Sequence, residues 1–347
     1  MYLKAAVLLA WMGGTYGLLV FGATAWRHAL PLSIALGLAL AGIGFNLQHD
    51  GGHGAFSART VINRVMASML DLLGGSSYVW HWKHNIIHHT YPNITGADDD
   101  LDGRPFLRLS PHQTRHRAHR FQHLYVWLLY GLLPIKWQLV DDVRNLVTGR
   151  IGAHRFPRPR GSALLALVVG KVLFLAWALG VPLLVHSVGV VLLFFFTTSF
   201  TLGVTLSLVF QLAHCVEEAD FPPPLEGAER TEYDWAIHQI RSTVDFGRNS
   251  RLLTWYLGGL NFQIEHHLFP RIAHVHYPAL ARIVEAACAE YRIPYRANTG
   301  LVGALTSHVR FLRRLGRPAA GSGSPVPAEL GVVSNLVLPW LPYERLP

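Results

Sequence analysis

Four long apolar runs constrain the fold of this 347-residue chain more than any other feature of its sequence. They cover residues 5–25, 29–47, 163–185 and 188–212. About 20 apolar residues in a helix suffice to cross the hydrocarbon core of a bilayer. The first two runs are separated by only a few residues, as are the last two, so each pair forms a hairpin. We therefore predict an all-α integral membrane protein with four transmembrane helices in two hairpins.

The rest of the chain forms two polar segments, which we expect to fold together as a helical cap. They cover residues 49–160 and 213–317. A signal peptide is the competing interpretation of the first apolar run, but a second run follows at once, which favours a hairpin. We predict one membrane domain over residues 1–317 and a low-complexity tail over 318–347. Within the cap we expect an interfacial helix over 121–140 and an amphipathic helix over 278–292.

The charge distribution predicts how the chain is oriented in the membrane. The formal net charge is +9, and the basic residues lie between the apolar runs. Cytoplasmic loops carry such an excess of lysine and arginine. We therefore expect the N-terminus and both cap segments to be cytoplasmic, and no nucleic acid to be bound. The excess of arginine over lysine is typical of a GC-rich bacterial genome and suggests a bacterial inner membrane. Lys171, inside the third run, should be paired or reach the interface.

The 20 histidines are the anomaly of the composition, and eight of them gather in four sets. In a helix, residues four apart share one face. That spacing joins His49 to His53 and His84 to His88. On the predicted topology, all four sets lie at the same face of the membrane. The eight residues are His49, His53, His84, His88, His89, His214, His266 and His267.

This arrangement predicts a site for two metal ions. Eight imidazoles exceed the four ligands of one tetrahedral zinc. The chain has only two cysteines, and nitrogen ligation without thiolates suits iron, copper, nickel or zinc. Asp50 and Glu265 could orient ligand imidazoles by hydrogen bonding, although simple solvation is an equal alternative.

Several other polar clusters have more ordinary interpretations. His81 is offset from the face shared by His84 and His88. We expect a solvated or lipid-facing surface for the histidines between 112 and 123, and a turn for His274 and His276. The acidic run 98–102 could bind a metal by itself, but we prefer to interpret it as a loop that faces the basic stretch 104–120.

The three spaced motifs resemble the histidine boxes of the membrane-bound fatty acid desaturases. They read His49-x3-His53, His84-x3-His88-His89 and Gln263-x2-His266-His267. The third box begins with glutamine in place of histidine, and in this it resembles the front-end branch of the family, the acyl-lipid or linoleoyl-CoA type. The resemblance covers roughly residues 30–300 and adds specific expectations about the chemistry.

The resemblance implies a non-haem centre of two iron ions that uses O2 to remove two hydrogens from an acyl chain. It implies the eight histidines as ligands, with Gln263 at the place of a ligand histidine in sister branches. Many front-end members carry a fused cytochrome b5 domain with a His-Pro-Gly-Gly motif, which this sequence lacks. The electrons are therefore expected from a separate ferredoxin or cytochrome b5 with its reductase.

Two alternatives to a desaturase remain open from the sequence. Hydroxylases and acetylenases of the same superfamily use the same boxes, and only the product separates them. A membrane metal transporter is the alternative from another class, and it would place its ligands inside the spans.

Overall fold

Four long apolar helices form two hairpins in the computed structural model, which describes residues 1–224 and 234–318. The helices that are long and apolar enough to cross a membrane are Tyr2–Gly22, Trp26–Gly52, Ser162–Leu183 and Val188–His214. The predicted fold class is confirmed. Most of the predicted tail, residues 319–347, lies outside the described residues.

Each hairpin is built from α-helical segments that are joined by short π-helical segments. The first comprises α1 (Tyr2–Gly17), η1 (Leu18–Gly22), α2 (Trp26–Ile43), η2 (Gly44–Gln48) and α3 (His49–Gly52). The second comprises α9 (Ser162–Leu175), η7 (Ala176–Gly180), α10 (Val181–Leu183) and α11 (Val188–His214).

The cap consists of short helices and two small sheets. Before the second hairpin lie α4 (Thr60–Ala67), α5 (Met69–Leu72), α6 (Ser77–Trp80), η3 (His81–His88), η4 (Asp99–Leu101), η5 (Arg117–Phe121), α7 (Gln122–Lys136), η6 (Trp137–Asp141) and α8 (Asp142–Thr148). After it lie α12 (Trp235–Ser242), α13 (Arg251–Tyr256), α14 (Gln263–Leu268), η8 (His274–His276), α15 (Tyr277–Glu290) and α16 (Leu301–Leu315). Strand β1 (Arg150–Ile151) pairs antiparallel with β2 (His154–Arg155), and β3 (Asp245–Phe246) pairs parallel with β4 (Ala297–Asn298).

Small residues bring the two hairpins close together. The hydrophobic effect does not drive helices together inside a bilayer, so their association depends on close packing, which small residues allow. A Cβ atom on Gly37 of α2 would lie 2.7 Å from the carbonyl oxygen of Thr198 on α11. On the other side of α11, a Cβ on Gly203 would lie 2.4 Å from the carbonyl oxygen of Tyr130 in α7. Helix α11 is therefore clamped between α2 and α7, and its last residue, His214, has a fixed position.

The one charged residue within the third span is paired, which settles the expectation for Lys171. Its ammonium lies 2.7 Å from Asp142 Oδ2 and donates to the carbonyl oxygen of Gln138 at 2.8 Å. The Asp142 side chain is fully buried. Removing one partner of a buried pair leaves an uncompensated charge, so this contact fixes the second hairpin to the cap.

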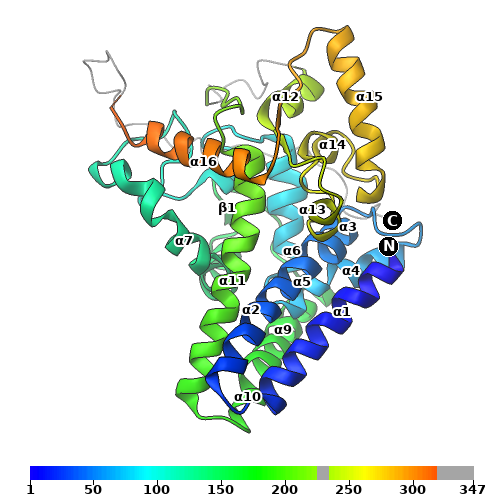
Figure 1. Ribbon diagram of the computed structural model, residues 1–347, viewed down its shortest axis with the longest axis vertical. Coiled ribbons are helices and arrows are strands. Elements are labelled where there is room, and N and C mark those ends of the chain that lie inside the picture. The colour runs from blue at the N-terminus through cyan, green and yellow to red at the C-terminus, as the bar shows by residue number, and fades with distance from the viewer. Residues whose placement is uncertain (225–233, 319–347) are drawn as a thin grey trace.

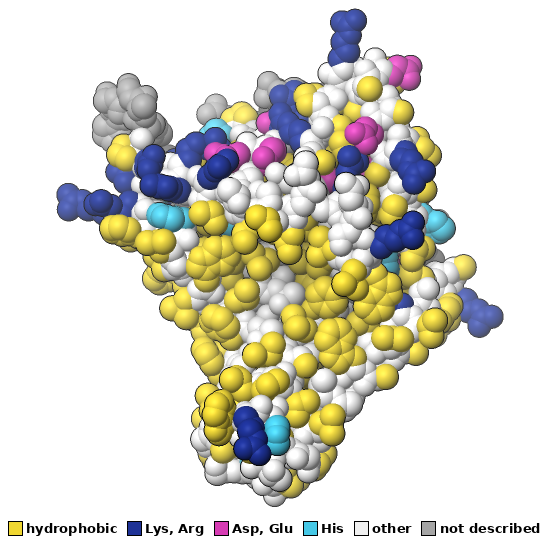
Figure 2. Space-filling model, viewed as in Figure 1, with side chains coloured by type: hydrophobic (Ala, Val, Ile, Leu, Met, Phe, Trp, Pro, Cys, Tyr) yellow, Lys and Arg dark blue, Asp and Glu magenta, His cyan; other side chains and the backbone are white. Residues whose placement is uncertain are grey.

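The cap lies at one end of the hairpins, together with the N-terminus (Figure 1). Apolar side chains cover the part of the surface formed by the hairpins, while most lysines, arginines and acidic residues lie over the cap (Figure 2). The predicted interfacial helix appears as α7, which packs obliquely along α11, and the predicted amphipathic helix 278–292 appears as α15. The fold thus separates a lipid-facing part from a polar part, and the histidine sets lie where the two meet.

Candidate metal centre

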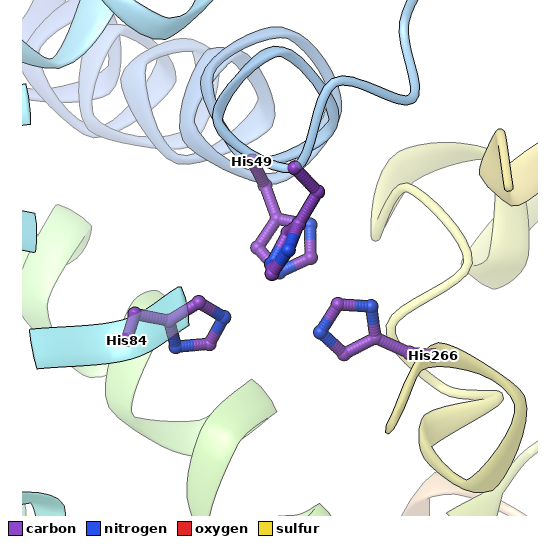
Figure 3. A group of neighbouring side chains, drawn as sticks. His49, His84 and His266 are labelled. Atoms are coloured by element: carbon purple, nitrogen blue, oxygen red, sulfur yellow. The ribbon is translucent and has the colours of Figure 1, made fainter. Parts of the chain in front are cut away.

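Four chain segments bring the eight predicted histidines into one buried cluster. His49 and His53 lie at the cap end of the second span, and His214 ends α11. His84 and His88 lie on η3, with His89 directly after it, and His266 and His267 lie on α14. None of the eight residues is more than 8% exposed. Figure 3 shows His49, His84 and His266 pointing toward a common centre from different elements.

Four of these histidines form a first group. Each of His49, His53, His84 and His266 offers a ring nitrogen, and these nitrogens lie within 4.8 Å of one another. The ring centres of His49 and His266 are 4.4 Å apart, and those of His49 and His53 are 4.7 Å apart. The predicted i, i+4 face at the end of the second span therefore exists.

Three further histidines form a second group beside the first. Ring nitrogens of His88, His214 and His267 again lie within 4.8 Å of one another. The ring centre of His88 is 4.7 Å from that of His214 and 5.0 Å from that of His267. Residues of three separate segments thus meet at a second point.

His89 lies between the two groups. Its ring centre is 4.7 Å from that of His266 in the first group and 4.4 Å from that of His267 in the second. Both of its ring nitrogens are buried without a hydrogen-bond partner in the described structure. This position connects the two groups into one centre.

The unpartnered nitrogens test whether these residues fit a metal. Buried polar groups in proteins are almost always hydrogen-bonded. Nevertheless, each of the eight histidines has at least one buried ring nitrogen with no partner among the described residues. A metal ion at each group would satisfy these nitrogens, because neutral imidazole is the commonest metal ligand. The donor set therefore fits two metal ions that prefer nitrogen.

The protonation of the cluster agrees with this fit. Burial, followed by the neighbouring imidazoles, lowers the pKa of His53, His84, His89, His266 and His267 well below the ordinary value. These rings are neutral at pH 7 and can bind metal without first losing a proton. His88 differs: burial lowers its pKa, but Asp98 and Asp100 outweigh that effect and the pKa is raised.

Glycines allow the segments that carry the first group to approach closely. A Cβ atom on Gly52 would lie 2.3 Å from the ring of Trp80, which stacks on His84 with ring centres 4.5 Å apart. The carbonyl of Gly52 accepts a hydrogen bond from Asn85 Nδ2 at 2.7 Å. Gly258 has φ +60°, and a Cβ there would lie 2.4 Å from the carbonyl oxygen of Phe45. These contacts dock η3 and the loop before α14 against the second span.

Side chains outside the cluster orient the second group. Asp98 accepts a hydrogen bond from His88 Nδ1 at 3.2 Å, and Gln239 Oε1 accepts one from His267 Nδ1 at 2.8 Å. Such partners fix the tautomer and direction of a ligand ring. Gln263 lies against His214, with its Nε2 atom 3.0 Å from His214 Nε2. The sequence motifs did not indicate Asp98 or Gln239, which no spacing connects to the histidines.

Asp50 and Glu265, the two carboxylates expected to orient ligand imidazoles, both have partners outside the histidine groups. Asp50 Oδ2 accepts a hydrogen bond from His274 Nδ1 at 2.8 Å, while its other oxygen is 3.9 Å from His49 Nδ1. Asp50 therefore contacts both His274 and His49, and its role in orienting His49 stays a prediction. Glu265 Oε1 accepts a hydrogen bond from Tyr295 at 3.0 Å.

The acidic run 98–102 also differs from the expectation. Only Asp102 pairs within the basic stretch, with Arg104 at 2.9 Å. Asp99 and Asp100 instead bind Lys83, at 2.9 and 3.1 Å, and Asp98 turns inward to His88. The interpretation of this run as a loop facing residues 104–120 was wrong for its first three residues.

The other histidines lie outside both groups, but two of them are more buried than expected. His274 is not an exposed turn residue: it lies between Asp50 and Lys4, whose ammonium is 2.8 Å from His274 Nε2. His119 is fully buried, and its Nε2 donates to the carbonyl oxygen of Pro105 at 2.9 Å. Both are structural residues.

Comparison with known proteins identifies the family that carries this arrangement. The family described as fatty acid desaturase matches residues 24–299. The chain belongs to the fatty acid desaturase family. The matched segment contains both histidine groups, the second helix of the first hairpin and the whole second hairpin. This desaturase is an oxidoreductase that acts on fatty acyl chains.

Relatives with assigned names support the front-end branch. The chain is 36% identical to the sn-1 linoleoyl-lipid 6-desaturase of Synechocystis sp. over 91% of its own length and 89% of the relative's. It is 35% identical to the enzyme of the same name from Arthrospira platensis, covering 91% and 85% of the two chains. It is 33% identical to the acyl-lipid (8-3)-desaturase of Physcomitrium patens, covering 91% and 66%. A metal transporter was expected to place its ligands inside the spans. The eight histidines lie instead at the cap ends of the spans or in the cap.

Proposed function

We propose that this desaturase uses two iron ions and O2 to introduce a double bond into a lipid-linked acyl chain. The proposal rests on the two histidine groups, in which each ring has a buried nitrogen without a partner among the described residues. The relatives named above act on acyl or linoleoyl lipids, which supports a glycerolipid-linked substrate over a soluble thioester.

The first group would hold one iron and the second group the other, with His89 between them. The irons supply the one-electron and O2 chemistry that side chains cannot perform on an unactivated C–H bond. The protein positions the imidazoles, keeps His53, His84, His89, His266 and His267 neutral, and excludes water from the buried centre.

Electron balance implies a separate donor. Removing two hydrogens from the acyl chain releases two electrons, whereas reducing O2 to two water molecules takes four. A partner must therefore deliver two electrons in each turnover, and we propose a ferredoxin, or a cytochrome b5 with its reductase. The cap is the only polar part at the histidine end of the described structure, so the donor would dock there.

The acyl chain would enter from the apolar side. A cavity of about 340 Å³ lies between the two hairpins, and its walls include Leu36, Leu40, Phe174, Phe195 and Leu202. Such a cavity has the size and apolar lining typical of ligand sites, and it could take part of an acyl tail. The basic residues of the cap favour a cytoplasmic centre in a bacterial inner membrane.

The decisive experiment combines metal and product analysis. The full chain is purified from iron-supplied cells for elemental analysis, and it is expressed with a redox partner in a host whose lipids are profiled by mass spectrometry. We expect two iron ions per chain and a lipid-linked acyl product lighter by two hydrogens. A product that gains oxygen would indicate a hydroxylase, and one that loses four hydrogens an acetylenase. Zinc transport into vesicles without O2 consumption would contradict the proposal.

A further inference from the structure

An arginine-lined cavity lies at the edge of the cap, apart from the metal centre. Its volume is about 640 Å³, and it is formed by the start of α7, the preceding η5 and the C-terminal end of α16. Its walls include five arginines, namely Arg115, Arg117, Arg120, Arg313 and Arg317. The proposed desaturase chemistry uses none of them.

The walls of this cavity are held in place by close backbone contacts. A Cβ atom on Gly316 would lie 2.3 Å from the carbonyl oxygen of His119, so the end of α16 touches η5 directly. Arg108 donates hydrogen bonds to the carbonyl oxygens of Leu315 at 2.7 Å and Pro111 at 2.6 Å. The arginines therefore project from a fixed frame.

The five positive charges have no acidic partner in the part of the chain that the structure describes. Other arginines of the cap have one: Arg104 pairs with Asp102 at 2.9 Å, and Arg314 pairs with Glu217 at 3.6 Å. The five cavity arginines form no ion pair with any described residue. Like charges gathered in one cavity repel each other, and an anion would relieve that repulsion.

The cavity continues into a lipid-facing surface. Phe121 and Leu124 line it and are 50% and 64% exposed, and Leu128, one turn further along α7, is 54% exposed. These positions share one face of the helix. Because α7 packs against the spanning helix α11, this apolar face runs from the cavity toward the membrane interior. Figure 2 shows lysine and arginine side chains gathered directly above apolar ones at this end of the molecule.

We propose that the cavity binds the phosphate headgroup of an anionic membrane phospholipid, with one acyl chain lying along the exposed face of α7. The planar guanidinium of arginine matches the geometry of phosphate oxygens. Attraction to an anionic leaflet is strongest for basic residues close to the membrane surface. A soluble acidic protein would need the charges but not the exposed phenylalanine and leucines beneath them, so the observations favour a lipid.

The test measures lipid preference with the full chain. The protein is reconstituted in nanodiscs that contain phosphatidylcholine with a fifth of phosphatidylglycerol, and the lipid retained after transfer to detergent is counted by native mass spectrometry. We expect preferential retention of phosphatidylglycerol. Replacing Arg117, Arg120 and Arg313 together with Gln should reduce the preference about a hundredfold, since each basic residue near the surface contributes a factor of about five.

A matched variant controls for net charge. Arg155→Gln, Arg251→Gln and Arg282→Gln together remove the same charge from exposed positions outside the cavity and should leave the preference intact. If the cavity triple variant does not fold, the single variant Arg313→Gln is measured and should lose about fivefold. Equal loss in both triple variants would overturn the proposal, and so would an unchanged preference in the cavity variants. Cavity-dependent binding of a purified acidic ferredoxin without any lipid preference would assign the site to a protein partner instead.

Discussion

The two histidine groups are held by different forces. In the first group, packing holds most of the rings: Trp80 stacks on His84, and its ring centre is 5.6 Å from that of His53. His266 also has a polar contact, with its Nδ1 atom 3.3 Å from Tyr277 Oη. In the second group, the rings are held by hydrogen bonds, from His88 to Asp98 and from His267 to Gln239. Packing therefore dominates in the first group and hydrogen bonding in the second.

This difference has a consequence for metal binding. Packing fixes the plane of a ring but leaves open which nitrogen carries the proton. A hydrogen bond at Nδ1 also fixes the tautomer, so His88 and His267 must present Nε2 to the centre. Both of these Nε2 atoms are buried without a partner. The first group should therefore be sensitive to volume changes nearby, and the second to the removal of single polar atoms.

The largest effect should come from the residue that both groups share. His89→Ala removes the ring between them, so we expect both metal ions to be lost and desaturation to fall to background. Elemental analysis and product profiling check this result. His276→Ala serves as the control, because His276 is exposed and lies outside both groups. Retention of two iron ions and full activity by the His89 variant would break the view of the two groups as one centre.

The next largest effect should come from crowding the first group. In Gly52→Val the new side chain would meet the Trp80 ring, because even a Cβ lies 2.3 Å from it. Overpacking typically costs about 1–3 kcal/mol, and the displaced Trp80 would tilt His84. We expect one iron to be lost while the second group keeps its own. Gly13→Ala is the matched control, since a Cβ there has nothing within 4 Å.

Sequence reasoning reached the histidines but not their supports, for a physical reason. Long apolar runs and i, i+4 spacing are local signals, so the four spans and the face shared by His49 and His53 followed directly from them. Asp98 is brought to His88 by a loop, and Gln239 to His267 by a separate helix. Contacts between distant parts of the chain leave no periodic pattern in the sequence. The same limit applies to Asp50 and Glu265, whose contacts with His274 and Tyr295 come from distant parts of the chain.

A smaller effect should come from removing one polar atom of the second group. Asp98→Asn keeps the size of the side chain but replaces a carboxylate oxygen that accepts from His88. Loss of such a partner typically costs 10–100-fold in metal affinity or activity. We expect a loss in this range, measured by iron titration and by initial rates. Asp102→Asn is the control, because Asp102 pairs only with the exposed Arg104. An equal response to both substitutions would show that hydrogen bonding does not hold this group.

The smallest effect concerns how the stability of the protein depends on the protonation of His308, which lies beside the chain segment that carries His214. His308 Nδ1 donates to the carbonyl oxygen of Cys215 at 2.7 Å, and its Nε2 accepts from Tyr130 at 2.8 Å. The contact with Tyr130 needs the neutral ring, because a protonated Nε2 cannot accept a hydrogen bond. Burial lowers the pKa of His308 to about 4, against about 6.5 in an unfolded chain.

Between these two pKa values the unfolded chain binds a proton that the folded chain does not, so the free energy of unfolding falls as the pH is lowered. From pH 7.5 to pH 5, the His308 contribution amounts to about 2 kcal/mol. His308→Gln can keep both hydrogen bonds but cannot titrate. The thermal unfolding midpoints of the two proteins are compared in detergent. As the pH falls toward 5, the midpoint of the variant should rise relative to that of the unchanged protein. A gap between the midpoints that is constant with pH would mean that His308 has the same pKa in the folded and the unfolded protein. Burial would then not keep its ring neutral at pH 5.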